Sequence, residues 1–193
     1  MQALKIIAVS ALAMLTAACS TTAVSLRYDP SAVAATAPKG PAVVGLTIVD
    51  NRQLDPKQLG AIRGGMGQPL KTLELDHPVS DVVRDAVLAG LTARGLAAAD
   101  KPKFQMTVTI DKLDCSQLVR REAHVLLRVQ VVDLSDAHPP YAKTVQANLA
   151  DGGSLTDTGI MASTDDLRKT ANDALQNAVD QLLDDQVFRS ELG

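Results

Sequence analysis

The sequence predicts an α+β fold: a two-layer α/β sandwich with a mixed sheet of four to five strands and two long helices on one face of it. Two observations lead to this prediction. Segments 78–95 and 164–188 carry apolar residues at the spacing of a helix with one buried face. Segments 104–111, 122–133 and 141–150 alternate apolar and polar residues, as do antiparallel strands that are covered on one side only.

The first strand of the expected sheet is Val43–Val49. It is apolar on both faces, which is typical of a central strand, and the polar residues Asp50–Arg52 end it. Residues 53–69 show no regular pattern, and Gly64–Gly67 within them predicts a flexible turn. Leu70–Leu75 is a candidate short strand.

Both helices carry recognisable end signals. The first starts near Pro78, which suits a first turn, and ends at Gly95, which suits the left-handed position after a helix. The second runs from about Thr164 to Phe188, and Ser163 or Thr164 is able to cap it.

The order of these elements sets the expected topology. The first helix makes a right-handed crossover from 43–49 to 104–111, which places those two strands parallel and close together. The last three strands form a meander. Both helices then lie on one face, and the polar side chains of 105–111, 124–130 and 144–148 lie on the other. The residues singled out there as a partner surface are Thr107, Thr109, Asp111, His124, Arg128 and Gln130.

The N-terminus has the pattern of a secretory signal. Lys5 precedes an apolar run, Ile6–Leu15, of about ten residues, whereas a helix that spans a membrane needs about 20. Leu15–Cys19 resembles the lipobox of bacterial lipoproteins, whose cysteine carries diacylglycerol and becomes the mature N-terminus. The resemblance implies a lipid anchor on Cys19 and, because Ser20 is not acidic, the outer membrane with the domain facing the periplasm. The alternative is an ordinary signal peptide cut near Cys19, which leaves a free thiol.

Three regions are therefore expected: a lipoprotein signal peptide at 1–18, a lipidated cysteine with a flexible tether at 19–41, and a single periplasmic α/β domain at 42–193. The tether is inferred from a stretch of Ala, Thr, Ser and Pro with little periodicity. An arm packed on the domain is the alternative for part of it, since Leu26 and Tyr28 are able to dock.

Composition disfavours several classes of function. The net charge of −3 and the pI near 5.5 lack the basic footprint that nucleic acid requires. Aromatic residues make up 2% of the chain and tryptophan is absent, which argues against stacking on bases or sugars. Once Cys19 is acylated, Cys115 is the one thiol left, so an intramolecular disulfide is ruled out. Cys115 is expected to be a small, partly buried apolar residue, with an intermolecular disulfide or reactive thiol as the alternative.

Several residues in this order resemble the YajG family of bacterial lipoproteins. They are the lipobox at Cys19, Val44–Thr47 running into Asp50–Arg52, the helix end Thr92–Gly95, and the long C-terminal helix. The likeness covers residues 41–192 and the signal. It implies a lipidated envelope protein, and Cys19 is the one functional position that it transfers. The glycine-rich stretch Gly64–Pro69 departs from the family pattern.

No cofactor, metal or catalytic residue is expected. His77, His124 and His138 do not have the spacing of metal ligands, and Gly64–Gly67 lacks the G-x-x-x-x-G-K-[ST] pattern of a phosphate loop. His124, Arg128 and Asp111 share the polar sheet face, but no nucleophile stands beside them, so a solvated face is the preferred interpretation.

Two functional hypotheses follow. The first is a non-enzymatic, membrane-anchored accessory lipoprotein that binds another envelope protein through the uncovered sheet face or by strand addition. The second is a periplasmic carrier or sensor of an apolar ligand such as phospholipid. It needs a cavity of about 300–1,000 Å³ between the helices and the sheet. An enzyme would need polar side chains that converge in a cleft, and the sequence offers no such set.

Overall fold

The structure is a computed structural model that describes residues 20–31, 44–97, 101–135, 139–152 and 158–192. The expected signal peptide, Cys19, residues 32–41 of the expected tether, residues 42–43 of the expected domain, and His138 lie outside the described residues.

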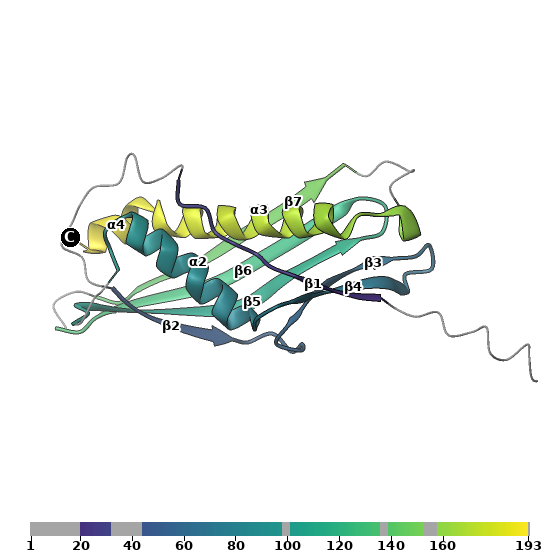
Figure 1. Cartoon of the computed structure of the whole chain (residues 1–193). Coiled ribbons are helices and arrows are strands. Elements are labelled where there is room, and N and C mark those ends of the chain that lie inside the picture. Colours follow the sequence, from purple (N-terminus) through teal and green to yellow (C-terminus); the bar gives the residue numbers. More distant parts are fainter. Residues whose placement is uncertain (1–19, 32–43, 98–100, 136–138, 153–157, 193) are drawn as a thin grey trace, which may run out of the picture.

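Within the described residues, seven strands form one mixed sheet, and the helices pack on one of its faces (Figure 1). The strands are β1 (Ser20–Val24), β2 (Val44–Asp50), β3 (Gln58–Arg63), β4 (Pro69–Leu75), β5 (Phe104–Gln117), β6 (Arg121–Asp133) and β7 (Tyr141–Asp151). The helices are α2 (Val79–Ala93), the 3₁₀ helix η2 (Gly159–Met161), α3 (Thr164–Leu183) and α4 (Gln186–Leu192). The strand order is β1-β4-β3-β5-β6-β7, and β2 pairs with β5. The α+β prediction with helices on one face is confirmed, but the sheet is larger than the expected four to five strands.

The strand β5 is longer than the expected segment 104–111 because its alternation changes phase. Even-numbered residues from Phe104 to Ile110 are buried, and odd-numbered residues from Leu113 to Gln117 are buried after them. The register of β5 with β6 shifts between Ile110 and Lys112, which is a β-bulge at Asp111. The extra residue interrupts the two-residue period, so the sequence pattern stops at 111 while the strand continues.

The strands β2 and β3 share one side of β5. β2 runs parallel to its first half, residues 104–110, and β3 runs parallel to residues 115–117. Apart from a single bridge between Val44 and Ala97, β2 has no second neighbour among the described residues. The prediction of a central strand at 43–49 is therefore wrong: β2 is an edge strand. The prediction of an irregular segment at 53–69 missed β3, which is short and contains a glycine.

Arg52 fills the gap between β2 and β3. Its buried guanidinium donates hydrogen bonds to the carbonyl oxygens of Gln58 at 2.9 Å, Leu113 at 3.1 Å and Pro56 at 3.3 Å. It also pairs with the carboxylate of Asp50 at 3.0 Å. A buried carbonyl that loses its ladder partner needs another donor, so this one side chain closes the interruption in the sheet.

Helix ends follow the sequence signals closely. Gly95 has φ +68°, and the amides of Gly95 and Leu96 donate to the carbonyl oxygens of Thr92 and Leu91, which is a Schellman motif. Ser163 caps α3, since its Oγ accepts a hydrogen bond from the Asp166 amide at 3.2 Å.

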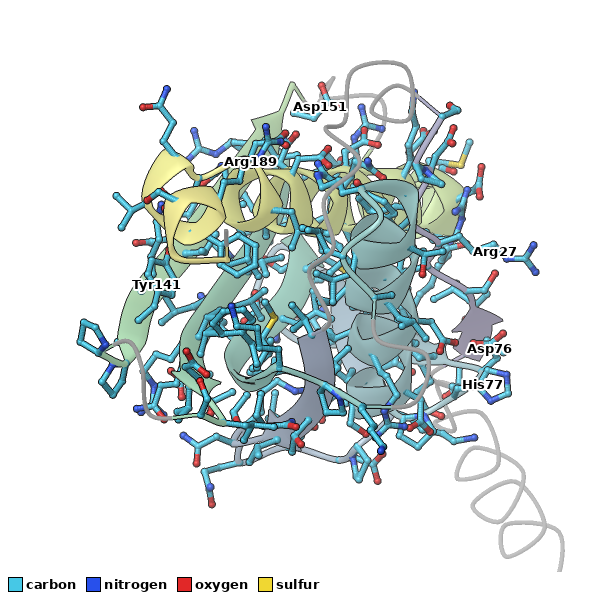
Figure 2. All side chains as sticks on the ribbon, turned by 90° about the vertical axis from the view of Figure 1, so that its left-hand side faces the viewer. Arg27, Asp76, His77, Tyr141, Asp151 and Arg189 are labelled. Carbon is cyan, nitrogen blue, oxygen red and sulfur yellow. The ribbon has the colours of Figure 1, made fainter. Side chains whose placement is uncertain are left out.

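The expected helix 164–188 is two helices. α3 ends at Leu183, and α4 begins at Gln186. Asp185 accepts hydrogen bonds from the Phe188 amide at 2.8 Å and from the Tyr141 hydroxyl at 3.2 Å, and it pairs with Lys143. These contacts fold α4 over β7, where Tyr141 lies (Figure 2).

Residues 20–31 form an arm that packs on the domain. β1 extends the sheet by pairing parallel with β4, and the chain then crosses to α3 (Figure 1). Leu26 and Tyr28 are buried, and a fully buried leucine side chain contributes about 1.5–3 kcal/mol. The flexible-tether prediction is therefore wrong for residues 20–31, and the alternative of a docked arm describes them.

A buried arginine holds the end of this arm. Arg94 donates to the Tyr28 hydroxyl oxygen at 3.1 Å, to Asp180 at 3.2 Å and to Asp184 at 3.0 Å. The Tyr28 hydroxyl donates to Asp180 at 2.5 Å. Burial raises the pKa of Tyr28, so this hydroxyl stays protonated and available as a donor. One guanidinium thus joins α2, α3 and the arm.

We predict that Gly60→Ala destabilises the protein by about 2 kcal/mol or more, since a Cβ there forces β3 away from β5. An added Cβ would stand 1.9 Å from the Cys115 carbonyl oxygen. Urea unfolding measures the effect. Gly65→Ala is the matched control: nothing lies within 4 Å of its Cβ, and its stability should stay within about 0.5 kcal/mol of the parent. Equal stability of the two variants would contradict the close approach of β3 and β5.

Candidate functional site

The sheet face opposite the helices is the candidate site, and we call it the open face. Its side chains lie in cross-strand rows. One row joins Val49, Thr109, Arg128 and Thr144, and the next joins Thr47, Thr107, Gln130 and Ala142. The described arm extends the sheet at its edge and does not cross this face. Four of the six residues expected there, Thr107, Thr109, Arg128 and Gln130, thus lie side by side.

Asp111 and Arg128 form the strongest polar contact on the open face. Arg128 Nη2 donates to Asp111 Oδ1 at 2.7 Å, Nε donates to the other carboxylate oxygen, and Asn51 Nδ2 adds a third hydrogen bond at 2.8 Å. The hydrogen bonds from Arg128 and then Asn51 lower the pKa of Asp111 to about 2. The β-bulge presents this carboxylate to Arg128. At neutral pH the Asp111 carboxylate is ionised and already accepts hydrogen bonds from Arg128 and Asn51. It is therefore better suited to binding a partner than to transferring a proton.

His124 is separate from this pair, although the sequence analysis grouped the three residues. It lies four positions before Arg128 on β6, which is about 14 Å along a strand. Its Nδ1 lies 2.9 Å from Asp114 Oδ1 instead. Sequence reasoning missed Asp114 because the bulge at Asp111 moves even-numbered residues of β5 onto the open face. The signal that was available is the apolar alternation that resumes at Leu113 and Cys115, with Asp114 between them.

The open face also exposes two valines that the sequence analysis did not assign to it. Val49 is 43% exposed and Val132 is 40% exposed, beside the polar rows. A shallow groove of about 250 Å³ lies on the same face over β6 and β7, lined by Thr109, Arg128, Val129, Gln130, Ala142, Lys143 and Thr144. Exposed apolar groups beside an arginine and uncharged polar groups suit a protein partner.

A second hollow lies on the outer side of α2. It has a volume of about 690 Å³ between residues 29–31 of the arm and the helix, and it is lined there by Leu88, Ala89, Thr92 and Ala93. A neighbouring groove of about 380 Å³ continues toward Asp76 and His77, which lie at the surface on this side (Figure 2). The apolar-carrier hypothesis placed its cavity between the helices and the sheet. The side chains of α3 that face the sheet are buried in the core there, and these grooves lie elsewhere.

The other residues that the sequence singled out, Cys115 and Gly64–Gly67, have roles in the fold. Cys115 is buried, and burial raises the pKa of its thiol to about 12, which disfavours a reactive thiol or an intermolecular disulfide. Gly64–Gly67 forms the turn between β3 and β4, closed by a hydrogen bond from the Gly64 amide to the Gln68 carbonyl oxygen at 2.8 Å. Within the described ranges, no three His, Cys, Asp or Glu residues are grouped to hold a metal ion. None of the described helices is both long and apolar enough to cross a membrane.

Comparison with known proteins identifies the fold. No family model and no curated protein matches the chain. Protein XCC0632 from Xanthomonas campestris, described with the family model DUF330, matches with a TM-score of 0.61 at 14% identity, over 85% of this chain and 92% of that chain. An uncharacterized protein matches with a TM-score of 0.57 at 9% identity, over 89% of this chain and 98% of that chain. At these identities the likeness is one of fold alone, and membership of the YajG family stays a prediction.

We predict that Arg128→Gln raises the pKa of Asp111 from about 2 toward its ordinary value of 3.8. Because folding lowers this pKa, the pair stabilises the protein above about pH 4 and loses that contribution as the pH falls toward 2. An NMR titration of the Asp111 carboxyl carbon measures the shift. Arg120→Gln is the control, since it removes the same charge from a pair with Glu122. An unchanged Asp111 pKa in Arg128→Gln would contradict the assigned pairing.

Proposed function

We propose that this chain is a non-enzymatic lipoprotein of the outer membrane, anchored through Cys19, that binds another envelope protein through its open face. The observation that carries the proposal is a sheet with helices on one face and, among the described residues, an uncovered opposite face. The lipobox-like Leu15–Cys19 supports the anchor and the envelope location.

The open face has the chemistry of a protein-binding surface. It carries exposed Arg128, Gln130 and Thr144, the partly exposed Thr107 and Thr109, and two valines that are 40–43% exposed. The Asp111 carboxylate already holds the Arg128 guanidinium in place, so a partner would bind an ordered guanidinium rather than a mobile one. Arginine fixed in this way loses less conformational entropy on binding than a free side chain.

Carriage of a phospholipid is the alternative function. It needs an apolar cavity that encloses acyl chains. The described grooves lie on the outer side of α2 and on the open face, and both are open to solvent, so they support this function less well than they support docking. Lipid that co-purifies in stoichiometric amount with the detergent-free protein would reverse this preference.

We predict that a photoreactive amino acid at Gln130 crosslinks one discrete envelope protein in intact cells. Gln130 is exposed on the open face, where a bound partner would lie within reach. Asn177, exposed on the far side of α3, is the matched control position and should give no such product. Cys19→Ser should weaken the product, because the released protein is diluted away from the membrane.

Mass spectrometry of the crosslinked band identifies the partner. Equal products from Gln130 and Asn177, or none from either, would contradict binding through the open face. Metabolic labelling with a fatty acid tests the anchor separately: label should enter the parent chain and be absent from Cys19→Ser.

A further inference from the structure

Four chain segments meet at one end of the sheet, which we call the loop end. They are the β3–β4 turn, the β5–β6 turn at 118–120, η2, and the start of β1 (Figure 1). Register pairs fix this arrangement: Ile62 of β3 lies beside Gln117 of β5, and Ser20 of β1 lies beside Lys71 of β4. Lys71 Nζ also donates to the Ala162 carbonyl oxygen at 2.8 Å, which holds the end of η2 against β4.

The loop end exposes large apolar side chains from three separate segments. Met66 in the β3–β4 turn is 92% exposed, Met161 in η2 is 77% exposed, and Leu118 and Val119 in the β5–β6 turn are 45% and 52% exposed. A single exposed apolar residue is ordinary. A group of them on neighbouring loops marks a surface that another apolar phase covers.

Most charged side chains at this end take part in ion pairs, and Arg63 donates to the Gly67 carbonyl oxygen at 3.1 Å. Arg120 pairs with Glu122, Arg121 pairs with Asp151 and Asp166, and Arg168 pairs with Asp165. The loop end therefore carries no strong excess of positive charge, and its apolar side chains supply the attraction.

The chain that precedes the structure emerges at the same end. Ser20, the first described residue, is the register partner of Lys71, and the β3–β4 turn ends at Pro69, two residues away. Two residues of strand span about 7 Å. Acyl chains on Cys19, which directly precedes Ser20, would thus begin within roughly 10 Å of the turn that holds Met66.

We propose that the loop end rests on a phospholipid surface, with Met66, Leu118, Val119 and Met161 at the boundary between headgroups and acyl chains. This inference rests on the proposed lipidation of Cys19. The inference adds an orientation to that anchor. Because Cys19 directly precedes β1, the link is too short for the domain to turn another end toward the bilayer. Apolar side chains at that boundary add their own affinity to that of the anchor.

The chain has no tryptophan, so a single introduced tryptophan reports on its surroundings. Met66→Trp and Val119→Trp place it at the loop end. Leu134→Trp places it at a similarly exposed apolar position, 56% exposed, beyond the other end of β6. Each full-length lipidated protein is reconstituted into vesicles of phosphatidylethanolamine and phosphatidylglycerol with brominated acyl chains, which quench tryptophan on contact. Flotation of the vesicles and thermal unfolding check anchoring and folding.

The expected result is that Met66→Trp and Val119→Trp lose several times more emission than Leu134→Trp, with little change when salt is raised. Floating, folded protein in which all three variants are quenched equally, or none is, overturns the orientation and leaves the anchor intact. Parent protein that carries no lipid and fails to float overturns the anchor and this inference together.

Discussion

β1 pairs with β4 from its first residue, Ser20, so no free chain separates position 19 from the sheet. Buried Leu26 and Tyr28 continue this attachment, and Arg94 locks it to both long helices. A segment whose composition is typical of a linker is thus an edge strand and an arm of the domain. The proposed orientation on a membrane depends on this pairing, because the pairing decides which end of the sheet follows the proposed anchor at Cys19.

The proposed functions fit together through this constraint. With the loop end on the bilayer, the 14 residues of β5 extend from Gln117 near the membrane to Phe104 at the far end, a span of about 45 Å. Thr109 and Arg128 then stand roughly 25 Å above the surface, on a face that is turned sideways into the periplasm. A partner that uses the open face must therefore reach close to the membrane, since no long tether carries the domain outward.

The sequence predicts what depends on local burial periodicity, and it misses what depends on long-range pairing. The sequence predicted the buried faces and the caps of α2 and α3, and it predicted the alternation of β6 and β7. It did not predict β1, because Ser20–Val24 has no pattern of its own and gains its structure from β4. Because of the bulge at Asp111, the predicted strand ended too early, and Asp114 was not assigned to the open face. Asp111 and Arg128 were both placed on the polar face, because the alternation of β5 is regular up to the bulge. The partner of His124, Asp114, follows the bulge and was missed.

The most direct test of this account is a disulfide between β1 and β4. Thr21 and Thr72 are register partners whose hydroxyl oxygens lie 3.0 Å apart, and adjacent strands are close enough for a disulfide. The account predicts that Thr21→Cys with Thr72→Cys forms one in nearly every molecule in an oxidising compartment. Thr22→Cys with Thr72→Cys should not, since neighbouring strand residues face opposite ways. A disulfide in neither pair, or equal yields in both, would contradict the docked arm.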